Sequence, residues 1–173
     1  TLGNPELKSE RSTNGDIGFV FERSELRILD RVYFEYAYFM SKADELIVFV
    51  QNSQNTARAE NISSATIRGH EVSWSATALQ HVRLFGNYTY QHTEDTSNTF
   101  SRGNKLPGRP QHELHQGLEL FAPQGKFAYE LDYIAQNFLD RANVFLVDSP
   151  LLHNLSVTAL PFGKRLKLAI EAT

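Results

Sequence analysis

Histidines and carboxylates are the side chains of this sequence that could bind a metal or catalyse a reaction. The tightest grouping is the segment HELH at 112–115. It superficially matches the zinc-binding sequence H-E-x-x-H, but its spacing differs and its surroundings are typical of a strand rather than a helix. Residues i and i+3 of a strand point to opposite faces, so His112 and His115 are poorly placed to share a metal ion.

Pairs of carboxylates are the other candidates for chemistry. Glu130 and Asp132 share one face of a predicted strand, as do Glu113, His115 and Glu119. Carboxylates in such rows far more often form a solvated charge network than a catalytic pair. The chain has no cysteine, which excludes disulfides, thiolate metal sites and cysteine nucleophiles. We therefore expect no enzymatic activity, no metal site and no cofactor.

The elements that carry these residues show a period of two. In VYFEYAYFM at 32–40, Val32, Phe34 and Tyr36 share one face with the next even-numbered residues, whereas Glu35 lies on the other face. Strong β-formers in strict alternation indicate a strand, and a helix with this sequence would have aromatic residues on every side. The same pattern recurs along the chain and predicts about eight strands. They lie at 16–21, 32–50, 71–76, 82–91, 113–120, 127–133, 154–159 and 166–171.

Short and long connections alternate between these strands. Residues 77–81, 122–126 and 161–165 form short turns, and 22–31 is only somewhat longer. The segments 52–61, 93–111 and 137–143 are longer and polar. Outer-membrane barrels alternate tight turns and long loops in this way. The sequence therefore predicts an all-β fold, an antiparallel up-and-down meander that is part of a large transmembrane β-barrel.

The two faces of the predicted sheet differ in composition. The polar face carries charged residues throughout, as in the lumen of a wide barrel: Glu35, Glu71, Arg83, Glu113, Glu119, Glu130, Asp132, Lys167 and Glu171. The apolar face carries aromatic residues, as in an interfacial girdle: Tyr36, Tyr38, Trp74, Tyr88, Tyr90, Tyr129 and Tyr133. His70 and Gln116 are exceptions on the apolar face, and a membrane interface would accommodate them.

Bulk properties narrow the class of protein. A chain of 173 residues is long enough for one domain. Its formal net charge of −3 gives no basic surface, so we expect no nucleic-acid partner. No apolar run approaches the roughly 18 residues of a membrane helix. The N-terminal residues lack the pattern of a signal peptide, which indicates a mature chain or a fragment.

Several short motifs follow one another along the chain. NPELKSERS at 4–12 is similar to the signature N-P-x-L-K-P-E-x-S, with Ser9 in place of proline. Residues 60–76 resemble the pattern N-x-x-x-A-x-x-x-G-x-E, and 106–113 resemble an entry from a loop into a strand. The matched residues are Asn61, Ala65, Gly69 and Glu71 in the first segment and Pro107, Arg109, Pro110 and His112 in the second. In this order along the chain, the motifs resemble those of TonB-dependent outer-membrane receptors.

The resemblance implies that residues 1–173 are the C-terminal part of a receptor barrel of about 22 strands, with the plug domain and the final strands lying outside this chain. It implies a bacterial outer-membrane protein that imports a scarce ligand, typically a ferric siderophore. The implied partners are the lipid bilayer, an extracellular small-molecule ligand of the ferric chelate class, and a TonB-type energy-transducing protein that acts through the plug.

A ligand-binding mouth would then lie where the ascending strands meet the long loops. Aromatic and cationic groups suit anionic, planar chelates. The residues that we predict at this mouth are Gln51, Asn52, Arg58, Tyr90, His92 and Arg102.

Two other classes of protein give the same alternation. One is a free-standing eight-strand outer-membrane barrel, either structural or lipid-modifying. The other is a soluble β-barrel that binds an apolar ligand inside, with its two faces exchanged. In an eight-strand barrel the charged face would fill a narrow interior and need nearly every charge paired. We therefore expect an open sheet without pairing between its first and last strands.

Overall fold

The computed structural model describes residues 3–51, 56–159 and 168–172, and all of its regular elements are strands. Within these residues there is no helix that could span a membrane. The strands are β1 (Arg11–Leu26), β2 (Leu29–Gln51), β3 (Ala57–Ala78), β4 (Val82–Asp95), β5 (His112–Ala122), β6 (Gly125–Ala135), β7 (Leu151–Ala159) and β8 (Leu168–Ala172). The all-β prediction is confirmed.

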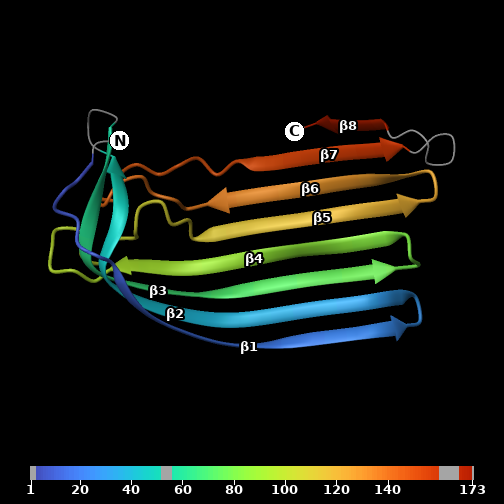
Figure 1. Cartoon of the computed structure of the whole chain (residues 1–173), viewed down its shortest axis with the longest axis horizontal. Coiled ribbons are helices and arrows are strands. Elements are labelled where there is room, and N and C mark those ends of the chain that lie inside the picture. The colour runs from blue at the N-terminus through green and yellow to red at the C-terminus, as the bar shows by residue number, and fades with distance from the viewer. Residues whose placement is uncertain (1–2, 52–55, 160–167, 173) are drawn as a thin grey trace.

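The eight strands form one antiparallel sheet in sequence order, in which each strand pairs with the next (Figure 1). Across the described residues, no ladder joins β1 to β8, so the sheet is open as predicted. Its two edges are β1 and the short β8, which pairs only with the last part of β7. A closed eight-strand barrel is therefore not the structure of this chain.

The connections divide the sheet into a short-turn end and a long-loop end. At the short-turn end, Arg27 and Ile28 alone separate β1 from β2, so the connection predicted over 22–31 is much tighter than expected. Residues 79–81 and 123–124 form the next two turns, and the turn predicted over 161–165 lies outside the described residues. At the long-loop end, residues 96–111 and 136–150 connect β4 to β5 and β6 to β7. The predicted alternation of short and long connections holds from β3 onward at the described positions. The long segment predicted over 52–61 is a correction, because its residues 57–61 belong to β3 and pair with residues 47–51 of β2.

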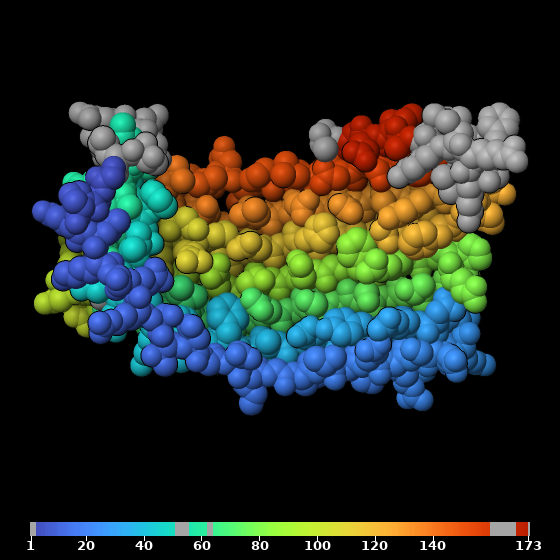
Figure 2. Space-filling view, in the orientation of Figure 1, coloured from blue at the N-terminus to red at the C-terminus, as the bar shows by residue number. Residues whose placement is uncertain are grey.

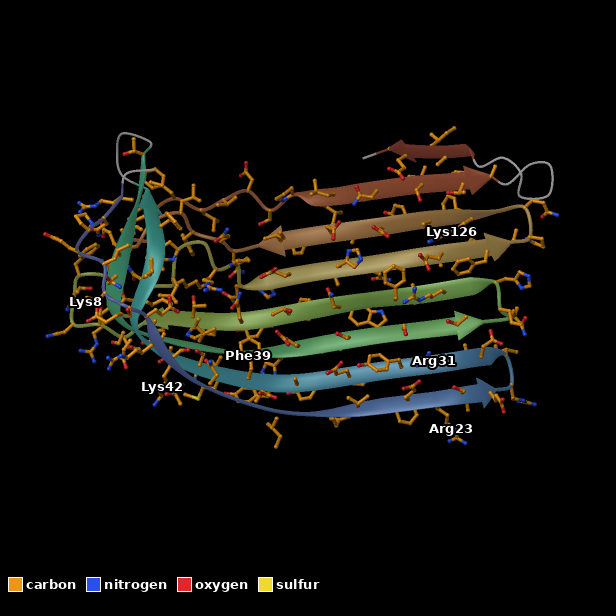
Figure 3. All side chains as sticks on the ribbon, viewed as in Figure 1. Lys8, Arg23, Arg31, Phe39, Lys42 and Lys126 are labelled. Carbon is orange, nitrogen blue, oxygen red and sulfur yellow. The ribbon has the colours of Figure 1, made fainter. Side chains whose placement is uncertain are left out.

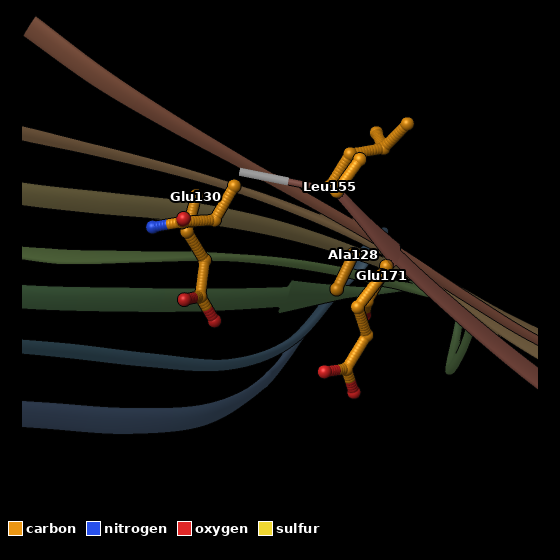
Figure 4. A pocket seen from close by; sticks show the side chains of 7 residues that line it. Ala128, Glu130, Leu155 and Glu171 are labelled. Carbon is orange, nitrogen blue, oxygen red and sulfur yellow. The ribbon is translucent and has the colours of Figure 1, made fainter.

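The strand register places side chains on the faces that the sequence predicted. Phe34 pairs with Trp74 on one face, and the neighbouring pair Glu35 and Ser73 lies on the other. In Figure 4 the Glu130 and Glu171 side chains extend to one side of the sheet and Leu155 to the opposite side. The sheet therefore has a polar face and an apolar face, each continuous over several strands.

At the long-loop end, β2 and β3 extend beyond the other strands as an outer hairpin, comprising residues 43–51 and 57–65. In Figure 1 the cyan end of this hairpin turns across the left edge of the sheet. Glu45, with a φ of 57°, interrupts the alternation, so that Ala43 before it and Leu46 and Val48 after it are all buried. These residues pack with Ala65 and the fully buried Leu106 of the following loop into a small apolar core.

The segment before β1 holds the outer hairpin in this bent position (Figure 2). Asn61 of the outer hairpin contacts this segment directly: its side chain accepts a hydrogen bond from the Lys8 amide at 2.9 Å and donates one to the Lys8 carbonyl at 3.1 Å. The same side chain donates to the Glu45 carbonyl at 2.6 Å. The Asn4 side chain donates to the carbonyl of Ala59 at 2.9 Å. Three residues of the receptor-like motifs, Asn4, Lys8 and Asn61, thus have a structural role.

Glycines in the sheet lie beneath aromatic rings of neighbouring strands. A Cβ atom on Gly69 would lie 2.6 Å from the Phe39 ring and 2.3 Å from the Tyr90 carbonyl oxygen. The same atom on Gly117 would lie 2.3 Å from the Phe85 ring. Ring and glycine together fill the volume of two ordinary side chains, which fixes the local register of the strands.

We predict that Gly69→Ala destabilises the folded protein by about 1–3 kcal/mol, because the added methyl group must displace a ring and a backbone carbonyl. The measurement is the urea midpoint at which the protein loses its heat-modifiable mobility on gel electrophoresis. Gly15→Ala is the matched control, since a Cβ on this strand glycine meets no atom within 4 Å. Equal midpoints for the two variants would contradict the prediction.

Candidate functional site

The polar face carries a network of ion pairs and hydrogen bonds across β4 to β7. Near the short-turn end the Glu119 carboxylate contacts Arg83 at 3.4 Å and Lys126 at 2.5 Å. Farther along the strands, Asp132 contacts the His115 ring at 2.7 Å and accepts a hydrogen bond from Asn154 at 3.2 Å. These groups remain partly exposed except for Glu119, so they line a surface in contact with water.

A hollow of about 510 Å³ lies on the polar face below the outer hairpin. Phe39, Glu71 and Gln91 line it from β2, β3 and β4, and Arg109 and Glu113 line it from the following loop and β5. The Gln91 side chain donates a hydrogen bond to the Pro110 carbonyl at 2.8 Å, which fixes the loop beside it. The hollow offers an aromatic ring, a guanidinium group and carboxylates to a ligand that approaches from the long-loop end.

The two long loops are held together by a buried aspartate. Asp95 is 2% exposed and accepts hydrogen bonds from Ser101 at 2.7 Å and from Arg141 at 3.2 Å. The amide of Ser97 also donates to it, at 2.9 Å. Arg141 comes from the other loop and also contacts Glu60 of the outer hairpin at 4.0 Å. One guanidinium group therefore connects the two loops and the hairpin.

The environment of Asp95, which lies beyond the aromatic girdle, favours its ionised form. Burial alone would raise the pKa of this carboxyl, but hydrogen bonds from Ser97, Ser101 and Arg141 outweigh it and hold the pKa below the ordinary value of 3.8. A carboxyl with a lowered pKa stabilises the folded state above its unfolded pKa, and this contribution is lost as the pH falls through the folded value.

We therefore predict that the long loops stay ordered down to about pH 4 and loosen below it. A nitroxide attached through Arg102→Cys reports loop motion, because the chain has no other cysteine. Its spectrum should show a restricted label at neutral pH and a mobile one as Asp95 becomes protonated. In an Asp95→Asn background the mobility should no longer change over this range; an unchanged transition there would contradict the assignment to Asp95.

On the apolar face, aromatic and histidine rings form a belt across β1 to β5. Its contacts run from Phe19 to Tyr36, His70, Tyr90 and His112, with ring centroids 5.3–6.3 Å apart. Three histidine rings of this face contact a tyrosine hydroxyl at 2.7–2.8 Å, in the pairs Tyr36–His70, Tyr88–His112 and Tyr129–His153. A hydroxyl partner satisfies each of these histidines on an otherwise apolar surface.

The residues that the sequence predicted at the mouth lie in different places. Tyr90 and His92 lie on the apolar face, beside Tyr38 and His70. Three of the other residues occupy the long-loop end: Arg58 of the outer hairpin donates to Asn4, Arg102 is exposed in the loop 96–111, and Gln51 ends β2. Asn52 lies outside the described residues. Their contact with a ligand stays a prediction.

Sequence reasoning missed the residues of the hollow on the polar face and the buried Asp95. Phe39 and Gln91 could have been found, because they alternate with residues assigned to the apolar face. In the sequence, Arg109 is recognisable only as part of the motif at 106–113. The pairing of Asp95 with Arg141 left no signal in the sequence, since 46 residues separate the two.

An open, curved antiparallel sheet with a charged face and an aromatic apolar face defines the class: a segment of a large β-barrel with lipid outside and water in its lumen. The chain belongs to the TonB dependent receptor-like β-barrel family, whose sequence model matches residues 1–173. Members of this family are outer-membrane transport receptors rather than enzymes.

Solved receptors share this fold at low sequence identity. The siderophore receptor PiuA from Acinetobacter baumannii aligns with a TM-score of 0.72 and 17% identity over 92% of this chain and 23% of its own. The ferric yersiniabactin uptake receptor FyuA from Yersinia pestis aligns with a TM-score of 0.71 and 16% identity, over 94% of this chain and 24% of its own.

The copper transporter OprC aligns with a TM-score of 0.70 and 15% identity, over 96% of this chain and 25% of its own. The chain thus spans about a quarter of the length of each of these structures. No curated protein matches it significantly.

Proposed function

We propose that this chain forms part of the barrel of an outer-membrane receptor that imports a ferric siderophore or a similar scarce chelate. The observation that carries the proposal is the hollow on the polar face, which faces the lumen in a receptor barrel and combines Phe39 and Arg109 with carboxylates, among them Glu71 and Glu113. A planar anionic chelate can stack on an aromatic ring and pair with a guanidinium group.

The remaining parts of the receptor lie outside residues 1–173 in this proposal. Strands that pair with β1 and β8 complete the barrel, because unpaired edges cannot face hydrocarbon. A plug domain inside the barrel contacts a TonB-type protein, which supplies the energy for import. The long-loop end faces the outside of the cell, so Arg58 and Arg102 can meet the ligand there.

Energised uptake of labelled chelates by cells that express the full-length receptor tests the function. We expect accumulation of at least one ferric siderophore, abolished by a protonophore. Copper is the second arm, because one structural neighbour is a copper transporter. Uptake of copper with no uptake of any ferric chelate would replace the siderophore class by copper.

Arg109→Gln tests the hollow itself. Removing one charged hydrogen bond should weaken binding of the transported chelate roughly tenfold. Arg31→Gln is the control, since Arg31 lies near the short-turn end of the sheet (Figure 3). Equal binding by both variants would exclude the hollow as the ligand site without affecting the class of protein.

A further inference from the structure

The apolar face contains a second hollow, of about 310 Å³, at the edge of the aromatic belt that is nearer to the long-loop end. It is lined by Tyr38, His70 and Tyr90, and by Arg68 and His92 one step farther along β3 and β4. Aromatic rings, imidazoles and a guanidinium group thus converge on the face that contacts lipid in a receptor barrel.

Arg68 is exposed and makes no hydrogen bond or ion pair with any residue that the structure describes. Its row across the sheet consists of Gly15, Met40, Arg68 and His92, and holds no acidic residue. A guanidinium group on a lipid-facing surface is costly unless it reaches an anion or water. Arg68 therefore lacks a counter-charge from its own chain.

The next two rows toward the long-loop end are balanced. Lys42 shares a row with Glu94, through Thr66 between them. Arg11 is paired with Asp44 in the row beyond. The excess of positive charge on this part of the apolar face is thus located at Arg68, directly beside the aromatic belt.

We propose that this hollow binds the phosphate group of a lipid in the outer leaflet. Aromatic belts lie at the level where acyl chains meet headgroups, so the row just beyond the belt lies at the level of lipid phosphates. Arg68 can donate two parallel hydrogen bonds to a phosphate. His92 supplies a further donor, and so do the hydroxyl groups of Tyr38 and Tyr90, whose rings contact the acyl chains.

Native mass spectrometry of the full-length receptor in detergent tests the proposal, with diphosphorylated lipid A as the probe. We expect Arg68→Gln to weaken binding of this lipid about tenfold and His92→Gln to weaken it less. Arg23→Gln is the matched control and should leave binding unchanged, because Arg23 of β1 lies on the same face of the sheet as Arg68 but at the short-turn end, where it pairs with Val32 (Figure 3).

Two further arms identify the ligand. The same glycolipid without phosphates should bind at least about tenfold more weakly than the phosphorylated form, and inorganic phosphate should not displace the bound lipid. Equal binding of both glycolipids, equal loss in Arg23→Gln, or displacement by inorganic phosphate would each overturn the proposal. None of these outcomes bears on energised uptake, so the inferred lipid site and the proposed import function fail separately.

Discussion

Leu131→Lys is expected to reduce sharply the yield of folded protein in membranes, whereas Glu130→Lys is expected to be tolerated. Leu131 lies on the apolar face of β6, in the row of Trp74 and Gln116, away from both ends of the sheet. A lysine on the lipid-facing side near the bilayer midplane costs about 2–4 kcal/mol. Glu130 lies one residue away on the polar face, where an added lysine reaches water.

The measurement is the folded fraction of full-length receptor in outer-membrane preparations, scored by heat-modifiable mobility and by resistance to protease. Asp132→Asn serves as a second control, because the amide keeps hydrogen-bonding capacity toward His115 and Asn154. Equal folded yields for Leu131→Lys and Glu130→Lys would show that the assignment of the two faces is wrong.

Asp95→Ala should release the two long loops from one another. The substitution removes the carboxylate that accepts hydrogen bonds from Ser97, Ser101 and Arg141. Arg141 is only 13% exposed at its side chain, so its charge would remain largely buried, with Glu60 at 4.0 Å as its remaining carboxylate. Breaking a buried pair in this way costs about 3–5 kcal/mol.

Hydrogen–deuterium exchange of the full-length receptor measures this effect directly. Amides in 96–111 and 136–150 should exchange much faster in Asp95→Ala, and those of the sheet should not change. Asp148→Ala is the control, because Asp148 is exposed in the second loop. If the amides of the two loops exchange at equal rates in Asp95→Ala and Asp148→Ala, Asp95 does not hold the loops together.

The strands and their faces were predictable because a period of two is a local property of the sequence. The alternation assigned Glu130 and Leu131 to opposite faces, and the register confirms this. The bend of the outer hairpin was not predictable, because a positive φ at Glu45 has no signature in its residue type. The tight turn at Arg27 and Ile28 was missed because neither residue is typical of turns.

The candidate site was less predictable than the fold. Tyr90 and His92 have residue types suited to a ligand site and lie near a long loop, yet they alternate in step with Tyr88, which places all three on the apolar face. The hollow on the polar face needs the register of four strands before Phe39 and Arg109 can be seen to share it. Contacts between distant segments, such as Asp95 with Arg141, depend on the folded loops.

The strict sequence order of the sheet has a consequence for folding speed. Every ladder joins neighbours along the chain, and the longest connection that must close between paired strands is 96–111. The entropy lost in closing each such loop is small and grows only slowly with its length. Local pairing of this kind favours fast formation. In the receptor barrel proposed above, the slow step of assembly is therefore expected to be the joining of β1 and β8 to their partner strands, rather than the pairing of strands within residues 1–173.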